Sequence, residues 1–434
     1  MSDIEIRGGK PLFGELSVQG SKNGVLPVMA AAILNRETVV LENVPGIQDV
    51  SCMMGILDSL GCRLGDAGIC DGGPRGYGSA AGQSAGPHGR LTIDASGVSS
   101  HTIDRDAMSQ MRSSIMLLGP LLGRVGQVEF SSPGGCSIGE RPIDLHRQAL
   151  EQMGVRFSER DGVVTAKVSR LKGAVIDLPF PSVGATENVV AAAVLAEGET
   201  VLEGAAREPE IGELCRFLNA CGAKIEGAGT GTIRIRGVKR LHGCTWRVGG
   251  DRIVAGTYLI AAAACGGEIN LLGADAGQLS SVCGILAKAG AKVESGADRI
   301  SLKAEGRPEA VRISTGPYPG FPTDLQSPLL ALCCVARGES VIEETVFEGR
   351  FKTAGELARL GAAIGIDGRT ARIEGRECLV GGHVRATDLR GGAALVIAGL
   401  LAQGTAYIGR REYIDRGYED IVRDLRTLGA RIKG

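Results

Sequence analysis

Apolar and polar positions follow a pattern that recurs six times along this chain. A phrase close to Leu-x-x-Leu-Gly-Ala-x-Ile centres on six glycines that are 93, 68, 68, 71 and 68 positions apart: Gly61, Gly154, Gly222, Gly290, Gly361 and Gly429. Within the phrase the apolar residues fall at helical spacing, the glycine takes the C-cap position, and a short strand follows. A period of ~70 residues is longer than the repeats of common solenoids, so it predicts six larger α/β units.

A second apolar phrase recurs in the same way and joins an uncharged, mostly alanine-rich run to a small turn and a β-branched strand. The six runs lie at 30–34, 119–123, 191–195, 261–264, 329–336 and 395–401. Because they carry no charge, we expect buried helices with sheets around them. Each unit then reads roughly strand, helix, strand, helix, strand, and six units fit two lobes of three units each.

The first repeat is longer than the others because of the segment Gly65 to Gly89. This segment is rich in glycine, alanine and serine and has no periodicity, which is typical of a flexible surface loop. Cys70 and His88 lie within it without metal-ligand spacing, so we expect neither to bind a metal.

Composition narrows the class of protein. The chain has 434 residues, a hydrophobic fraction of 44%, a net charge of −1 and only 3% aromatic residues. The near-zero charge and the few aromatics argue against a nucleic-acid or anionic membrane partner. The charged N-terminus does not resemble a secretory signal, and the apolar stretch Gly391 to Ala402 is too short to span a bilayer, so we expect a cytoplasmic protein. The twelve cysteines show no Cys-x-x-Cys spacing, and we expect no metal and no cofactor.

The segment Ser131 to His146 carries a single thiol, Cys136, behind Pro133-Gly-Gly and five residues before Arg141. Glycines at this density favour a mobile loop. A nearby cation favours the thiolate and also binds anionic substrates. The composition therefore suits a catalytic lid. A surface loop with an incidental small residue is an equally good reading of the loop alone.

Lysine and arginine lie at places where helices or strands should end. Lys22 and Asn23 follow Gly20-Ser21 and precede an apolar helix, so a helix N-terminus and an ammonium group could hold a phosphate together. A simple N-cap explains the same residues. Three arginines lie at equivalent positions at one end of different repeats: Arg112, Arg390 and Arg416. Each of them alone could be solvated or paired locally.

One carboxylate lies in a comparable position. Asp324 belongs to Phe321-Pro-Thr-Asp, a turn between an expected strand and an expected helix. The position suits an N-cap, and a capping carboxylate that faces a substrate can also act as a general base.

Together these motifs resemble the UDP-N-acetylglucosamine enolpyruvyl transferases of the enolpyruvyl transferase superfamily. The resemblance spans nearly the whole chain, from Gly20-Ser-Lys-Asn-Gly to Ile414-Asp-Arg-Gly-Tyr-Glu. Its most specific motifs are Pro-Gly-Gly-Cys-x-Ile-Gly-x-Arg-Pro-x-Asp-Leu-His at 133–146, Ser-Val-Gly-Ala-Thr at 182–186, Ala-Arg-Glu-Pro-Glu at 206–210, Phe-Pro-Thr-Asp at 321–324 and Thr-Asp-Leu-Arg at 387–390.

The resemblance implies an α/β fold made of a two-lobed inside-out α/β barrel, with six pseudo-repeated units and three units per lobe. It places the lobe that carries the cysteine loop at residues 22–248. The second lobe combines residues 1–21 with 249–434, and the active site is expected in the cleft between the lobes.

The implied reaction transfers the enolpyruvyl group of phosphoenolpyruvate to the 3-hydroxyl of UDP-N-acetylglucosamine and releases phosphate, as the first committed step of peptidoglycan synthesis. The resemblance makes Cys136 the general acid, the site of a covalent adduct and the target of fosfomycin, and it makes Asp324 the general base, with Lys22 and Arg416 also catalytic. Phosphoenolpyruvate is expected at Lys22, Asn23, Arg112, Arg141, Arg390 and Arg416. The nucleotide sugar is expected at Asn23, Arg112, Arg141, Pro142, Ile143, Asp144, Leu145, Ser182, Val183, Gly184, Asp324 and Val346.

The chain departs from the family's pattern at a few places that remove no catalytic group. Val254 replaces a glutamate, Gly24 replaces an alanine, and the Gly65 to Gly89 segment is long. Two alternatives remain open. One is enolpyruvyl transfer to another acceptor, such as shikimate-3-phosphate or another nucleotide. The other is a non-catalytic paralogue that binds a nucleotide sugar, although such a protein should have lost Lys22, Cys136 or Asp324.

Overall fold

The computed structural model describes residues 3–65, 89–105, 108, 111–131, 139, 142–296 and 298–434. Two compact units divide the chain: a C-terminal unit with Met1–Gln19 and Gly250–Gly434, and an N-terminal unit with Gly20–Gly135 and Arg141–Gly249. The chain therefore passes from one unit to the other at Gln19–Gly20 and returns at Gly249–Gly250. The interior of the expected loop, with Cys70 and His88, lies outside the described residues.

Among the described residues the strands form six sheets, three in each unit, and this confirms the two-lobed α/β fold expected from the sixfold repeat. In the fullest example a parallel pair, β9 (Val175–Asp177) and β10 (Glu199–Glu203), is joined through the buried helix α6 (Val183–Ala193). Helix α7 (Pro209–Ala220) follows, and an antiparallel hairpin of β11 (Lys224–Glu226) and β12 (Thr232–Arg236) then completes the sheet.

The expected unit of three strands was wrong by one strand in five of the six sheets, which have four strands among the described residues. The segment after the second helix folds back on itself, and at β11–β12 the turn uses Gly227 at a φ of +80°. The returning strand β12 pairs with β10, because its backbone groups would otherwise lack partners at the sheet edge.

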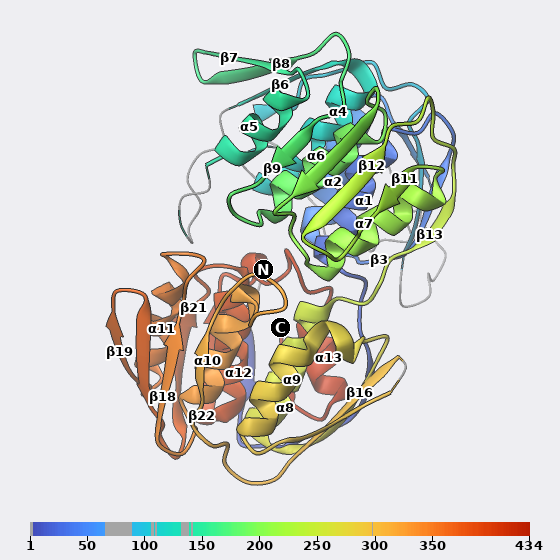
Figure 1. Cartoon of the computed structure of the whole chain (residues 1–434). Helices are drawn as coiled ribbons and strands as arrows, with labels where there is room; N and C mark the ends of the chain where they lie inside the picture. The colour runs from blue at the N-terminus through green and yellow to red at the C-terminus, as the bar shows by residue number, and fades with distance from the viewer. Residues whose placement is uncertain are drawn as a thin grey trace. The chain divides into compact units, whose positions relative to one another are not determined.

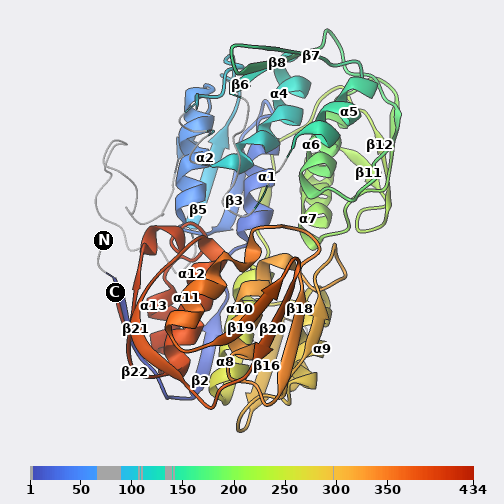
Figure 2. The same cartoon turned by 90° about the vertical axis from the view of Figure 1, so that its left-hand side faces the viewer.

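The rest of the N-terminal unit repeats this plan (Figure 2). One sheet contains β3 (Val39–Val44), β4 (Arg63–Gly65), β5 (Gly89–Asp94) and β13 (Thr245–Arg247), with helices α1 (Lys22–Ala32) and α2 (Gln48–Ser59). The other contains β6 (Gln127–Ser131), β7 (Arg156–Arg160) and β8 (Val163–Lys167), with η1 (Arg112–Leu117), α4 (Leu118–Val125) and α5 (Asp144–Gln152).

The C-terminal unit has three sheets of the same kind (Figure 1). The first contains β2 (Leu12–Ser17), β14 (Gly267–Leu272), β15 (Lys292–Ser295) and β16 (Arg299–Ala304), with α8 (Arg252–Cys265), η2 (Ala276–Leu279) and α9 (Ser280–Lys288). The second contains β17 (Arg312–Ser314), β18 (Glu339–Glu343), β19 (Ala363–Asp367) and β20 (Thr370–Glu374), with η3 (Thr323–Leu325), α10 (Gln326–Cys333), η4 (Arg350–Lys352) and α11 (Thr353–Arg359). The third contains β1 (Ile4–Arg7), β21 (Leu379–Arg385), β22 (Ala402–Gly409) and β23 (Arg431–Lys433), with α12 (Leu389–Leu401), η5 (Arg411–Tyr413) and α13 (Ile421–Thr427).

The buried helices confirm the expectation drawn from the uncharged runs. Every residue of α8 from Arg252 to Ala264 is buried, and α8, α10 and α12 pack against one another inside a single apolar core (Figure 1). Small side chains allow this close approach. At Gly119 of α4, for example, an added Cβ would lie 2.1 Å from the backbone oxygen of Asn188 in α6. None of the described helices is both long and apolar enough to cross a membrane.

Candidate functional site

The strongest charge cluster in the C-terminal unit surrounds Asp324, which lies in η3 between β17 and α10. Its carboxylate accepts a hydrogen bond from Arg390 at 3.0 Å and a second, short one from Arg350. The two arginine side chains are only 3% and 4% exposed, whereas the Asp324 side chain is 25% exposed. Neither η3 nor α10 has a side-chain N-cap, so the capping alternative for Asp324 is wrong.

Arg390 is buried in the first turn of α12, below its N-cap Asp388. Burial by itself lowers the pKa of the guanidinium, but the nearby Asp324 carboxylate raises it, and the net shift is upward. The group therefore stays charged, as buried charges do when they are paired. Its Nη1 has no hydrogen-bond partner among the described residues. A buried charged donor without a partner is costly, so an anion that reached Nη1 would bind there. The buried Tyr418 side chain also interacts with this guanidinium.

A buried carboxylate, Glu344, orders the segment next to Asp324. Glu344 accepts hydrogen bonds from the backbone N–H of Val346 at 2.8 Å and of Phe347 at 3.0 Å, and from the Thr323 hydroxyl at 3.0 Å. The backbone at Val346, one of the predicted nucleotide-sugar residues, is thus tied to the turn that carries Asp324. Sequence reasoning missed Glu344 and Arg350, because their partners lie 21 and 26 positions away in no recognisable motif.

Arg416 lies half-buried in the turn that follows η5. The next residue, Gly417, packs so tightly against Leu389 that an added Cβ would lie 2.8 Å from its side chain. Tyr418 is buried and shares a 2.8 Å hydrogen bond with Thr257 of α8. The structure therefore places the Arg416 turn beside the N-terminal turn of α12, where Arg390 lies.

In the N-terminal unit Lys22 is the first residue of α1, and Ser21 caps the helix by accepting from the Gly24 N–H at 3.0 Å. The Lys22 ammonium lies 2.7 Å from Asp49 of α2, and both side chains are largely buried. Glu213 of α7 occupies the space beside Gly24, so that an added Cβ there would lie 2.4 Å from its Oε2. The alanine usual at this position would therefore displace the Glu213 carboxylate.

The two segments predicted to bind the nucleotide sugar meet in the N-terminal unit. Residues Pro142 to Leu145 lead into α5, while Ser182 caps α6 by accepting from the Ala185 N–H at 3.4 Å. Helices α5 and α6 touch where the His146 ring lies against Gly184, since a Cβ at Gly184 would lie 2.9 Å from it. Asn188 Nδ2 lies 3.0 Å from His146 Nδ1, so the two segments share one polar link that sequence reasoning missed.

Three predicted residues are not placed. Cys136 and Arg141 lie outside the described residues, and so does the side chain of Arg112, whose backbone begins η1. Their roles stay predictions. Among the described residues, no group of three or more histidine, cysteine or acidic side chains could hold a metal ion.

Helix α6 also holds a buried carboxyl group, Glu187. Burial raises its pKa to about 8, and the negative charges of Glu210 and Glu208 add to the shift. Because this pKa is above the ordinary value of 4.5, the folded protein holds a proton that the unfolded chain releases between these two pH values. The contribution of Glu187 to stability is therefore lost progressively as pH rises through this window.

We expect Glu187→Gln to flatten this pH dependence. The amide carries no proton to lose. The thermal midpoint of the variant should therefore fall less than that of the native protein between pH 5 and pH 9, a range that includes the Glu187 pKa of about 8. Thermal unfolding across that range measures it, with Glu203→Gln on the exposed face of β10 as the matched control. If the thermal midpoint changes equally with pH in all three proteins, the raised pKa of Glu187 is contradicted.

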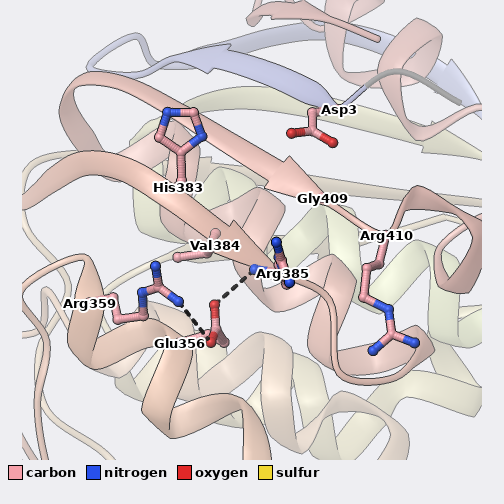
Figure 3. Close-up of a pocket in the computed structure, with 8 residues that line it drawn as sticks. All are labelled: Asp3, Glu356, Arg359, His383, Val384, Arg385, Gly409 and Arg410. Atoms are coloured by element: carbon pink, nitrogen blue, oxygen red, sulfur yellow. Dashed lines mark hydrogen bonds and ion pairs between the residues drawn. The ribbon is translucent and has the colours of Figure 1, made fainter.

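The C-terminal unit contains a separate hollow of about 650 Å³ at the ends of β21 and β22 (Figure 3), lined by Asp3, Glu356, Arg359, His383, Val384, Arg385, Gly409 and Arg410. None of the predicted site residues lines it. Figure 3 shows Glu356 between Arg359 and the backbone of Arg385, and Glu356 bonds to both at 3.5 and 2.8 Å. Arg410 lies 3.7 Å from Glu412. Three arginines and two carboxylates line this hollow, and nothing in the structure assigns a ligand to it.

Comparison with known proteins shows the family of this chain. A family described as EPSP synthase (3-phosphoshikimate 1-carboxyvinyltransferase) matches residues 6–78 and 82–425. The chain is 45% identical to UDP-N-acetylglucosamine 1-carboxyvinyltransferase 2 of Caldanaerobacter subterraneus subsp. tengcongensis, over 100% of this chain and 99% of that protein. It is also 45% identical to UDP-N-acetylglucosamine 1-carboxyvinyltransferase of Ruegeria pomeroyi, with the same coverage.

Solved structures share the fold over the whole chain. The enolpyruvyl transferase NikO from Streptomyces tendae superposes with a TM-score of 0.86 at 26% identity, covering 100% of this chain and 99% of that one. EPSP synthase from Acinetobacter baumannii superposes with a TM-score of 0.73 at 20% identity and the same coverage, which shows a shared fold alone.

Proposed function

Because this chain belongs to the UDP-N-acetylglucosamine 1-carboxyvinyltransferases of the enolpyruvyl transferase superfamily, we propose that it transfers the enolpyruvyl group of phosphoenolpyruvate to UDP-N-acetylglucosamine. The acceptor is the 3-hydroxyl of the sugar, and phosphate is released. The protein then acts in the cytoplasm at the first committed step of peptidoglycan synthesis, where the acceptor is a soluble nucleotide sugar.

The observation that carries the proposal in this chain is the buried Asp324–Arg390 pair with the unpartnered Nη1 of Arg390. Phosphoenolpyruvate brings a phosphate and a carboxylate, and a guanidinium binds either through paired N–H donors. We assign Arg390 to this anion, together with Lys22, Asn23, Arg112, Arg141 and Arg416. The nucleotide sugar is assigned to Pro142–Leu145, Ser182–Gly184, Asp324 and Val346, with Asn23, Arg112 and Arg141 shared.

The chemistry proceeds by addition and then elimination. The sugar oxygen forms a bond to the carbon that bears the phosphate, while its proton passes to a base and the methylene carbon gains a proton from an acid. The new methyl group then loses a proton and the bond to phosphate breaks. Asp324 serves as the base and Cys136 as the acid, because a carboxylate and a thiol can each exchange a proton near neutral pH once they are positioned.

The two ion pairs of Asp324 hold its carboxylate in place. Arg390 makes its bond through Nη2, so its Nη1 remains for the anion of phosphoenolpyruvate.

Phosphate release tests the proposal directly. With phosphoenolpyruvate present, the native protein should release phosphate when UDP-N-acetylglucosamine is added and not when shikimate-3-phosphate is added. Cys136→Ala should abolish this release, while Cys283→Ala, which changes a half-buried thiol of α9, should retain it. Release with shikimate-3-phosphate would move the assignment to that acceptor, and nucleotide binding without any release would identify a binding paralogue.

A further inference from the structure

The backbone of the turn that carries Arg416 is bonded by a distant side chain, Gln19. The Gln19 amide donates to the backbone oxygen of Gly417 at 3.1 Å and accepts from the backbone N–H of Glu419 at 2.8 Å. These two backbone groups flank Tyr418, so one side chain closes both sides of the turn. Gln19 is only 3% exposed, and both ends of its amide are used.

Gln19 stands at a special place in the chain. It is the last residue of the C-terminal unit before the chain crosses into the N-terminal unit, and its backbone oxygen accepts from the Asp251 N–H at 2.9 Å, just after the chain returns. Asp251 in turn caps α8 by accepting from Ile253 and Val254 at 2.8 and 3.0 Å. The support for the Arg416 turn is therefore anchored in the segments where the chain changes units.

The same turn has other contacts among the described residues, and none of those printed replaces the amide. Gly417 packs on Leu389, and the Tyr418 hydroxyl meets Thr257 at 2.8 Å. Within the turn, the Tyr418 N–H donates to the Ile414 oxygen at 3.1 Å. The two Gln19 bonds are the ones that join the Gly417 oxygen and the Glu419 N–H to a distant segment of the chain.

We infer that Gln19 is a positioning residue that holds Arg416 in place to bind phosphoenolpyruvate. This inference rests on the proposed role of Arg416. A buried amide that satisfies one carbonyl and one N–H acts like a short β-bridge, and its loss removes these two hydrogen bonds from the turn. The turn should then sample other conformations, and Arg416 should spend less time where the substrate anion binds.

Two variants separate hydrogen bonding from packing. Gln19→Ala removes the amide and leaves a cavity, whereas Gln19→Met keeps the side-chain length and loses only the hydrogen bonds. Both should raise the KM for phosphoenolpyruvate roughly 10-fold or more, which is the loss expected for two hydrogen bonds. The KM for UDP-N-acetylglucosamine should stay unchanged. If Gln19→Met keeps the native KM for phosphoenolpyruvate, then packing holds the turn and the inference is wrong.

A matched control exists in α7. The Asn219 amide donates to the Ile225 oxygen and accepts from the Ile225 N–H, both at 2.9 Å, and so makes the same pair of bonds away from the proposed site. Asn219→Ala should leave both KM values unchanged. Hydrogen–deuterium exchange should speed up at the Glu419 amide in the Gln19 variants and at the Ile225 amide in the control. Unchanged exchange at Glu419 would also overturn the inference.

The outcomes distinguish this inference from the proposed function. No phosphate release by the native protein would defeat the function before any variant is compared. A native KM for phosphoenolpyruvate in Arg416→Ala would remove the role of Arg416 on which the inference rests. A raised KM in Arg416→Ala together with a native KM in both Gln19 variants would overturn the inference alone.

Discussion

Asparagine at position 324 should reduce the rate of enolpyruvyl transfer by about 10²–10⁴-fold, the usual contribution of a general base. The amide has nearly the size of the carboxylate but accepts no proton near neutral pH. It also removes the anion that Arg350 and Arg390 share, while Arg350 keeps Asp388 at 3.9 Å. The measurement is kcat with both substrates saturating, beside thermal unfolding, because a buried cation that loses a counterion destabilises the unit.

Two measurements distinguish a general base from a residue that only forms ion pairs. If Asp324 is the base, kcat falls by a much larger factor than the affinity for UDP-N-acetylglucosamine. If Asp324 only orders the two arginines, the main effect is a higher KM for phosphoenolpyruvate. Asp367→Asn, on the exposed face of β19, serves as the control and should match the native protein. A native kcat in Asp324→Asn would remove Asp324 from the chemistry.

Arg390→Met should lower kcat/KM for phosphoenolpyruvate by roughly 10²–10³-fold, as expected when one partner of a buried charge pair is truncated. Methionine fills much of the space of the arginine and leaves no charge behind. Asp324 keeps its bond to Arg350, so the unit should still fold. Initial rates measured against phosphoenolpyruvate concentration give kcat/KM.

Arg390→Lys should also lower kcat/KM for phosphoenolpyruvate, so a lysine should not replace this arginine. An ammonium is a point charge without the planar fork by which Arg390 bonds Asp324 while Nη1 stays available. Arg372→Met, in which an exposed side chain of β20 is changed, should behave as the native protein. Native kcat/KM in either Arg390 variant would exclude this guanidinium from substrate binding.

The repeats could be predicted from the sequence because their signals are local. Glycine C-caps after helical apolar patterns gave the six units, and uncharged alanine-rich runs gave the buried helices. The second strand of each hairpin was missed. A short alternating segment such as 232–236 has a clear pattern of its own, but only its pairing with β10 shows that it completes the sheet.

The candidate site shows the same difference between local patterns and distant contacts. Motifs proposed Lys22, Arg390 and Arg416 for an anion and Asp324 for a base, because residue type and position in a repeat suggest such roles without any coordinates. They said nothing about what holds these groups. Arg350 reaches Asp324 across 26 positions, and Glu344 reaches Thr323 across 21.

The sequence by itself thus determined the number of repeats, the buried helices and the residue types of the site, because each depends on neighbours along the chain. Only the tertiary structure decided that Asp324 pairs with two arginines rather than capping a helix, and that Gln19 holds residues 417 and 419 from 398 and 400 positions away. The physical reason is the range of the interaction. A helix pattern is set within a few residues, whereas a buried hydrogen bond or ion pair depends on where distant segments come to lie once the apolar helices have packed.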